Sequence, residues 1–138
     1  MKTTHELTLY HDLPAPQEYC ALRVAAGLSP RTEQAAERGL PNTLYATLLR
    51  DADRLVAMGR VVGDGGCNFE IVDVAVHPDY QRLGLGTRIM AAISSYLERN
   101  APASAYISLI ADHYSPALYR KFGFEPVAPN SIGMARKR

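Results

Sequence analysis

Residues 72–86, VDVAVHPDYQRLGLG, join an apolar strand pattern to a glycine-containing turn and then to a long helix pattern. Pro78 ends the strand, because it has no backbone N–H to donate to a neighbouring strand. Gly84 and Gly86 lack a Cβ, so the chain can bend tightly and approach a ligand closely there. The first N–H groups of the following helix have no intrahelical partners, and with the positive helix end they suit a pyrophosphate. The stretch therefore indicates a phosphate-binding turn.

The residues around this turn exclude two common phosphate-binding motifs. A nucleoside-triphosphate loop places Lys and then Ser or Thr directly after its second Gly, whereas Gly86 is followed by Thr87 and Arg88. A dinucleotide-binding fingerprint needs a third Gly, and none follows Gly86 in the turn. What remains is the pattern Gln81-x-x-Gly84-x-Gly86, preceded by a strand.

This pattern resembles the acetyl-CoA signature of the GCN5-related N-acetyltransferases (GNAT). A second landmark of that family stands near the C-terminus at residues 118–124, LYRKFGF. The two landmarks occur in the family's order and at its usual separation, so the resemblance covers about residues 54–126. It implies an α/β (α+β) fold with a mixed central β-sheet flanked by helices on both faces, acetyl-CoA as acyl donor, and no metal.

The periodicity of apolar residues predicts one domain, residues 1–138, with the element order βααβββαβαββ. Ser29 followed by Pro30 is expected to begin the second helix, as N-cap and first-turn residue. The expected strands are 6–11, 43–50, 54–62, 68–76, 105–110, 125–127 and 132–135, and the expected helices are 17–26, 31–38, 84–99 and 116–122.

Composition and charge indicate which partners and which cellular location to expect. The chain has 138 residues, which matches the commonest domain size, and its net charge of +1 gives no field to attract nucleic acid. It has no apolar run long enough to cross a membrane and no signal-peptide pattern at its N-terminus, so no membrane partner and a cytoplasmic location are expected. Cys20 and Cys67 lack metal-ligand spacing and are expected to be reduced thiols.

The resemblance also implies which residues contact acetyl-CoA. In the family, the pantetheine arm lies where the fourth and fifth strands separate, and the following turn wraps the pyrophosphate. Asp112 stands where the family often has an Asn that contacts the arm. The residues implied are Val74, Ala75, Val76, Gln81, Arg82, Leu83, Gly84, Leu85, Gly86, Thr87, Asp112 and Tyr119.

Transfer of an acetyl group to an amine needs a route for the amine proton and a donor to the departing thiolate. Tyr119 matches the Tyr that the family places near the CoA sulfur, and Tyr114 is a second candidate. Glu70, 14 residues before Gly84, matches the catalytic Glu of histone-type members. Asp73 is the alternative base, and a water chain is another. In a regular strand Glu70 and Asp73 face opposite sides, but a bulge near Val74 would change that.

Three functions fit these residues. The first is acetylation of a primary amine of a small molecule by direct attack in a ternary complex, which a short chain with little extra substrate apparatus favours. The second is acetylation of a protein or peptide. The third is a non-catalytic acyl-CoA-binding regulatory module, against which Tyr119 and Glu70 argue. Small family members commonly form homodimers, and strand 132–135 would leave an open sheet edge, so a homodimer is expected.

Overall fold

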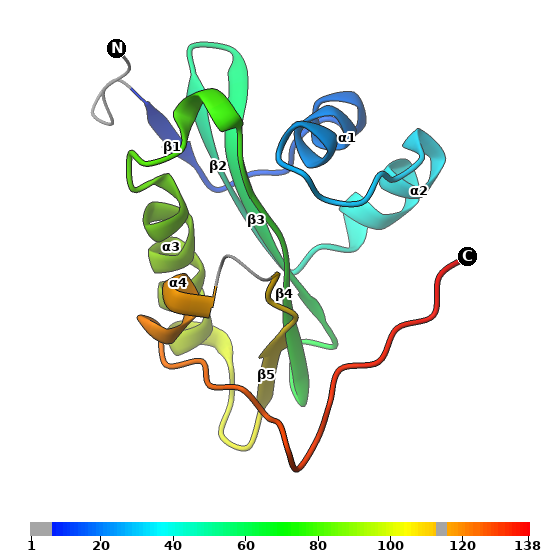
Figure 1. The fold of residues 1–138 in the computed structure, drawn as a ribbon, viewed down its shortest axis with the longest axis vertical. Helices are drawn as coiled ribbons and strands as arrows, with labels where there is room; N and C mark the ends of the chain where they lie inside the picture. The colour runs from blue at the N-terminus through cyan, green and yellow to red at the C-terminus, as the bar shows by residue number, and fades with distance from the viewer. Residues whose placement is uncertain (1–6, 113–115) are drawn as a thin grey trace.

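In the computed structural model, five strands form one sheet in the order β1-β2-β3-β4-β5 (Figure 1). Strands β1 to β4 pair antiparallel with their neighbours, whereas β5 pairs parallel with β4, so the sheet is mixed. The structure describes residues 7–112 and 116–138. The strands are β1 (Thr8–Tyr10), β2 (Tyr45–Asp51), β3 (Arg54–Gly63), β4 (Asn68–Val76) and β5 (Tyr106–Leu109).

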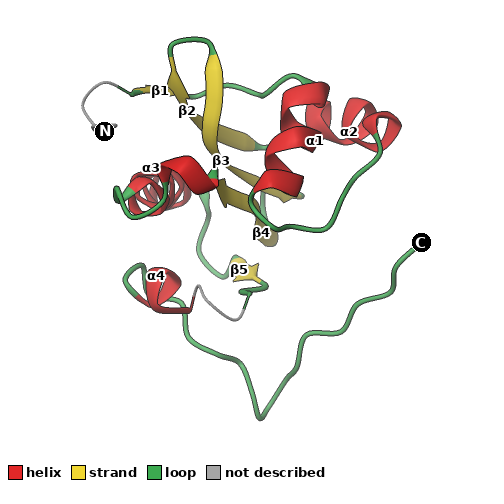
Figure 2. Ribbon diagram, turned by 45° about the horizontal axis from the view of Figure 1, so that its top comes forward, coloured by secondary structure: helices red, strands yellow, loops and turns green. Residues whose placement is uncertain are grey.

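Helices cover both faces of the sheet (Figure 2). On one face lie α1 (Pro16–Ala25) and α2 (Glu33–Gly39), and on the other lie α3 (Leu85–Asn100) and α4 (Pro116–Arg120). The short 3-10 turns η2 (Leu40–Asn42) and η3 (Pro78–Tyr80) lead into β2 and toward α3. The expected mixed sheet with helices on both faces is confirmed. No helix within the described ranges is long and apolar enough to cross a membrane.

The start of α2 differs from the sequence expectation. Thr32, not Ser29, is the N-cap, and its hydroxyl accepts the backbone N–H of Ala35 at 3.1 Å. The Ser29 hydroxyl accepts hydrogen bonds from Arg23 and Arg31 instead. The prediction of a Ser29-Pro30 helix start was wrong because two arginines engage the hydroxyl that would have served as the cap.

The two closing strands expected at 125–127 and 132–135 are absent from the sheet. After α4 the chain runs away from the sheet to its C-terminus (Figure 1). The alternating apolar residues there predict strands. A β-strand, however, is assigned only where its backbone pairs with a second strand. Within the described part of this single chain nothing pairs with these residues, so the final two elements of the expected order were wrong.

A bulge interrupts the pairing of β3 and β4. Met58 pairs with Ala75 and Arg60 pairs with Val72, so Asp73 and Val74 together stand opposite Gly59. The backbone of Asp73 has φ +58°, in the left-handed region. The bulge near Val74, considered from the sequence as an alternative to a regular strand, is present.

The bulge changes which face of the sheet each β4 side chain occupies. Before it, Phe69 and Ile71 pack in the core beneath α3, and after it Val74 packs against that same core. Glu70 alternates with Phe69 and Ile71, so it lies on the face of α1 and α2. Asp73 contacts α1 and therefore lies on that same face. The two carboxylates that a regular strand would separate are thus on one side of the sheet.

Gly59 lets α3 lie close to the bulge. A Cβ at this position would stand 2.6 Å from Ile89 Cγ2 and 2.9 Å from Ile93 Cδ1, closer than carbon atoms approach. Both isoleucines are fully buried on α3. The absence of a side chain at Gly59 therefore fixes the distance between α3 and the part of the sheet that carries the bulge.

Candidate active site

The pairing of β4 with β5 stops halfway along β4. The parallel register runs from Asn68 opposite Tyr106 to Ile71 opposite Leu109, while β4 continues to Val76. Beyond Ile71, no strand of the described residues lies beside this edge of β4. Val74, Ala75 and Val76, whose backbone groups are expected to bind the pantetheine arm, lie in this open part of the strand.

The glycine turn lies at the end of this open edge. Gly84 is the N-cap of α3 with φ +78°, and Arg82 has φ +65°, so two left-handed residues curl the loop. The first turn of α3 carries no acidic side chain that would offset the positive helix end. A hollow of about 200 Å³ is lined here by Val76, Gln81, Arg82, Gly84, Leu85, Gly86, Thr87 and Leu118.

The lining of this hollow includes every residue expected at the pyrophosphate except Leu83. Leu83 packs against the core beside α3. Its size, its curled loop and the start of a 16-residue helix suit a diphosphate group. Leu118 was not anticipated. A Cβ on Gly86 would lie 3.3 Å from Leu118 Cδ2, so the second glycine of the motif permits the close approach of α4.

Tyr119 follows Leu118 on α4 and is partly buried against the core beneath α3. Tyr119 also lines a larger cavity of about 740 Å³. Tyr114, the second phenol considered from the sequence, lies outside the described residues. The cavity is lined by Glu70, Ile71, Val72, Asp73, Val74, Ile110, Asp112, Tyr119 and Lys137, and by Arg23, Ala26, Gly27, Leu28, Ser29 and Arg31 from α1 and the loop after it.

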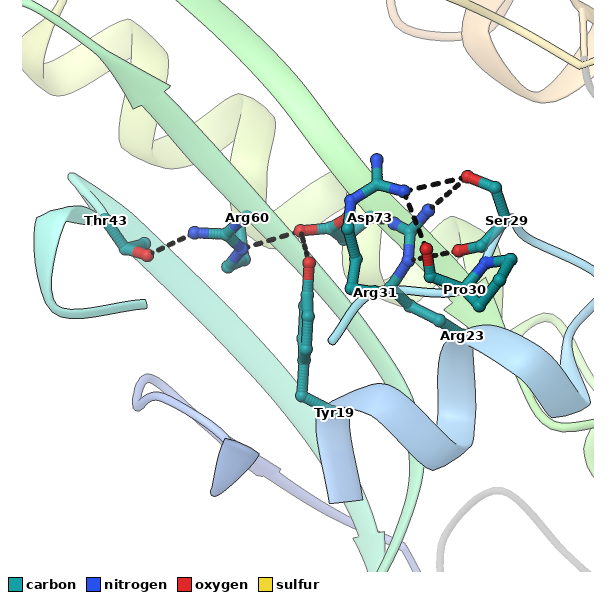
Figure 3. Close-up of polar contacts among 8 residues, drawn as sticks. All are labelled: Tyr19, Arg23, Ser29, Pro30, Arg31, Thr43, Arg60 and Asp73. Carbon is teal, nitrogen blue, oxygen red and sulfur yellow. Dashed lines mark hydrogen bonds and ion pairs between the residues drawn. The ribbon is translucent and has the colours of Figure 1, made fainter. Parts of the chain in front are cut away.

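Glu70 and Asp73 occupy different environments in this cavity. Glu70 has no hydrogen bond or ion pair with another described residue, so its carboxylate is available to a ligand. The Asp73 side chain is only 5% exposed. Figure 3 shows it between two arginines and a tyrosine.

The contacts of Asp73 use both of its oxygens. Arg60 Nε donates to Oδ2 at 2.7 Å, and the Tyr19 hydroxyl donates to the same oxygen at 2.9 Å. Arg23 forms an ion pair with Oδ1. Burial, and secondarily the charge of Asp73, raise the pKa of the Tyr19 phenol above its ordinary value. The phenol therefore stays protonated and serves as a donor to the carboxylate.

The two arginines extend this cluster into the surrounding elements. Arg60 donates to the Thr43 hydroxyl at 2.6 Å, and Arg23 Nε donates to the backbone carbonyl of Ser29 at 2.9 Å. The cluster of Tyr19, Arg23, Arg60 and Asp73 thus joins the β4 bulge to β3, α1 and the loop that lines the cavity. Sequence reasoning missed these roles of Tyr19, Arg23 and Arg60. The available signal was an arginine inside an apolar run, Leu22-Arg23-Val24 on α1.

The described residues offer no candidate metal site. Within residues 7–112 and 116–138, no group of three or more His, Cys, Asp or Glu side chains is placed to hold a metal ion.

Asp73→Asn is expected to lower the free energy of unfolding by about 3–5 kcal/mol, because it leaves two buried guanidiniums without a counter-charge. Urea denaturation of the purified chain measures this. Asp79→Asn is the matched control: Asp79 is 72% exposed and 4.0 Å from Arg54, so the change should cost less than about 1 kcal/mol. Equal stability of the two variants would contradict the structural role of Asp73.

Comparison with known proteins agrees with this geometry. Residues 42–126 match the family model described as an acetyltransferase (GNAT) domain. The crystal structure of a probable acetyltransferase from meticillin-resistant Staphylococcus aureus, a protein of unknown function, has a TM-score of 0.93 and 49% identity. That likeness covers 96% of this chain and 99% of that one.

Curated relatives match over shorter stretches. The uncharacterized N-acetyltransferase ycf52 of Porphyra purpurea is 44% identical over 71 residues, 51% of this chain and 40% of that protein. The chloroplastic serotonin N-acetyltransferase 2 of Oryza sativa subsp. japonica is 31% identical over 118 residues, 81% of this chain and 58% of that protein. The histone acetyltransferase TAP1 of Glycine max is 38% identical over 82 residues, 59% of this chain and 34% of that protein.

The chain spans about half the length of these curated relatives, or less. The family model, in contrast, covers more than half of the chain and includes the glycine turn, the open part of β4 and the helix of Tyr119. This chain therefore belongs to the GNAT family of N-acetyltransferases.

Proposed function

We propose that this chain transfers the acetyl group of acetyl-CoA to a primary amine of a small molecule, by direct attack in a ternary complex. GNAT acetyltransferases use acetyl-CoA. The observation that carries the proposal is that Glu70, a carboxylate with no partner among the described residues, and Tyr119 line one cavity beside the opening between β4 and β5.

The donor substrate would lie along the edge of β4. The open edge of β4 at Val74 and Ala75 would hydrogen-bond an extended amide-containing arm, in the way that one strand pairs with another. At the end of this edge the Val76 carbonyl accepts a hydrogen bond from Gln81 Nε2 at 3.2 Å. The curled loop and the first amides of α3 would hold the diphosphate. When bound there, acetyl-CoA supplies the activated acetyl group as a thioester, with its sulfur directed toward Tyr119.

Glu70 and Tyr119 would divide the proton transfers. As the amine nitrogen bonds to the acetyl carbon and the carbon–sulfur bond breaks, the amine loses a proton and the sulfur gains negative charge. Glu70 is the group that would accept the amine proton, through a water molecule where the amine does not reach it. Tyr119 would donate its hydroxyl proton or hydrogen bond to the sulfur. Asp73 would not act as the base, because two guanidiniums and a phenol already occupy its oxygens.

The size of the cavity supports a small acceptor. About 740 Å³ lies within the usual range for pockets that bind small molecules, roughly 300–1,000 Å³. The loop after α1 forms one of its walls. The relatives include both a serotonin and a histone acetyltransferase, so the class of acceptor needs a direct test.

A panel of acceptors tests this proposal. Polyamines, amino-acid derivatives, arylalkylamines and lysine-containing peptides are each incubated with the chain and acetyl-CoA, and the free thiol of CoA is measured. We expect release with at least one small amine and none above background with the peptides. Release with peptides alone would favour a protein acetyltransferase, and acetyl-CoA binding without release on any acceptor would favour a regulatory module.

Gly84→Val is expected to abolish acetyl-CoA binding. A Cβ at Gly84 would meet no protein atom within 4 Å, so it would occupy the space meant for the diphosphate. At about 100 times its dissociation constant, acetyl-CoA should stabilise the native chain by roughly 2.7 kcal/mol, measured as a shift in Tm. Gly65→Val is the control, because Gly65 has a similar φ of +80° but lies between β3 and β4. A retained shift in Gly84→Val would contradict the assignment of the loop.

Tyr119→Phe is expected to lower kcat by ~10²–10⁴-fold if the hydroxyl donates to the sulfur, which is the usual effect of losing a positioned acid. The aromatic ring and its packing are retained, so the acetyl-CoA shift in Tm should be unchanged. Tyr106→Phe, on the outer strand β5 and 57% exposed, is the control and should keep full kcat. An unchanged kcat in Tyr119→Phe would show that this ring only packs.

A further inference from the structure

Two arginines donate to one serine hydroxyl in the lining of the cavity that contains Glu70 and Tyr119, here called the acceptor cavity. Arg31 Nη1 lies 2.9 Å from Ser29 Oγ, and Arg23 Nη2 lies 3.1 Å from the same atom (Figure 3). All three residues are part of the cavity lining. The two guanidiniums therefore lie next to each other, and their like charges repel. An anion bound beside them would offset this repulsion.

The chain balances the charge of these arginines only in part. Asp73 forms ion pairs with both Arg23 and Arg60, so one carboxylate serves two guanidiniums. Arg31 forms no ion pair with any residue that the structure describes, and its second hydrogen bond goes to the neutral carbonyl of Pro30 at 3.2 Å. The Arg31 side chain is also exposed, so a ligand in the cavity can reach it. This wall of the cavity therefore has an excess of positive charge.

The Ser29 hydroxyl has a proton left to donate. A serine hydroxyl offers two acceptor positions and one O–H donor. Arg23 and Arg31 occupy the acceptor positions, and no described residue accepts the O–H. An oxyanion here would receive charge-assisted hydrogen bonds from Arg31 and a further hydrogen bond from Ser29. The planar guanidinium matches the oxygens of a carboxylate or phosphate.

The opposite sign of charge lies on another part of the same lining. Glu70 comes from β4, whereas Arg31 comes from the loop after α1, and neither has an ion pair among the described residues. Lys137 adds a second cation to the lining. The cavity thus presents a carboxylate and cationic groups from different elements, and its volume of about 740 Å³ has room for a small molecule that carries both complementary charges.

We infer that the acceptor carries a carboxylate or phosphate group in addition to its primary amine. Arg31 and Ser29 bind this oxyanion, and the amine lies at Glu70. The inference rests on the proposed function and narrows its class of acceptor. Arg23 holds Ser29 in place through both the hydroxyl and the carbonyl. A polyamine is disfavoured, because its second ammonium would face the guanidinium of Arg31.

Pairs of amines that differ in one anionic group test the inference. The pairs are alanine with alaninamide, γ-aminobutyrate with its amide, and phosphoethanolamine with ethanolamine. In at least one pair kcat/KM should be at least tenfold higher for the anionic member, and added NaCl should reduce that preference because salt screens the attraction. The carboxylate and phosphate pairs show which oxyanion the site takes. Acetylation of amines with no preference for the anionic member in any pair would overturn the inference.

Arg31→Gln assigns the preference to this wall of the cavity. The variant should reduce the ratio of the two kcat/KM values to near one, mainly through a higher KM for the anionic member. Arg38→Gln is the matched control, because it makes the same change of charge at an exposed position of α2 outside the cavity lining. It should keep the native ratio. A ratio that survives Arg31→Gln, or that Arg38→Gln lowers equally, would overturn the inference.

Binding measured without acetyl transfer separates this inference from the proposed function. Phosphoethanolamine and γ-aminobutyrate are added without acetyl-CoA, and the shift in Tm is recorded. At least one of them should stabilise the native chain and Gly84→Val, which excludes the glycine turn as the place of binding, but not Arg31→Gln. If the native chain acetylates no amine, the proposed function fails, while these shifts still decide the anion site. No shift in the native chain, or an equal shift in Arg31→Gln, would overturn it.

Discussion

One additional residue in β4, placed opposite Gly59, is the constraint on which the site depends. The bulge at Asp73 and Val74 increases the local bend and twist of the strand. β4 parts from β5 two residues earlier, after Ile71, which leaves the edge where an acyl donor can lie. The same bulge turns Glu70 and Asp73 to one face. A strand without the additional residue would keep its pairing and would direct one carboxylate into the core beneath α3.

The bulge persists because both of its faces are constrained. Beneath it, Gly59 allows Ile89 and Ile93 of α3 to pack where any side chain would collide. Above it, Arg23 and Arg60 hold the carboxylate of Asp73 in a left-handed backbone conformation. Two guanidiniums on one carboxylate leave a net positive charge beside the cavity. Arg23 also donates to the Ser29 carbonyl, which ties the cluster to the loop after α1 that lines the cavity, and Arg60 donates to the Thr43 hydroxyl just before β2.

Local patterns predicted most of the fold and one half of the site. The glycine turn, the start of α3 and the strands β2 to β4 follow from short-range periodicity, and the structure has them within a few residues of the expected bounds. The bulge was considered from the sequence only as an alternative to a regular strand. The Asp73 cluster was not predicted, because its partners are 50 and 13 residues away in sequence and only the packed fold brings them together. The closing strands failed for a related reason: apolar alternation predicts an extended chain but does not say which chain pairs with it.

β4 beyond Ile71 and the outer side of β5 both lack a neighbouring strand among the described residues. Beyond Ile71, no described strand lies beside β4 on this side, because β5 ends at Leu109. The outer edge of β5 has no strand beside it among the described residues, and Tyr106 and Ile110 there are 57% and 70% exposed. Ile110, directly after β5, lines the same cavity as Val72, Asp73 and Val74 of β4, so the place where the two strands part opens onto the candidate site. Lys137 also lines this cavity, so the course of the chain after α4 contributes to the shape of the site.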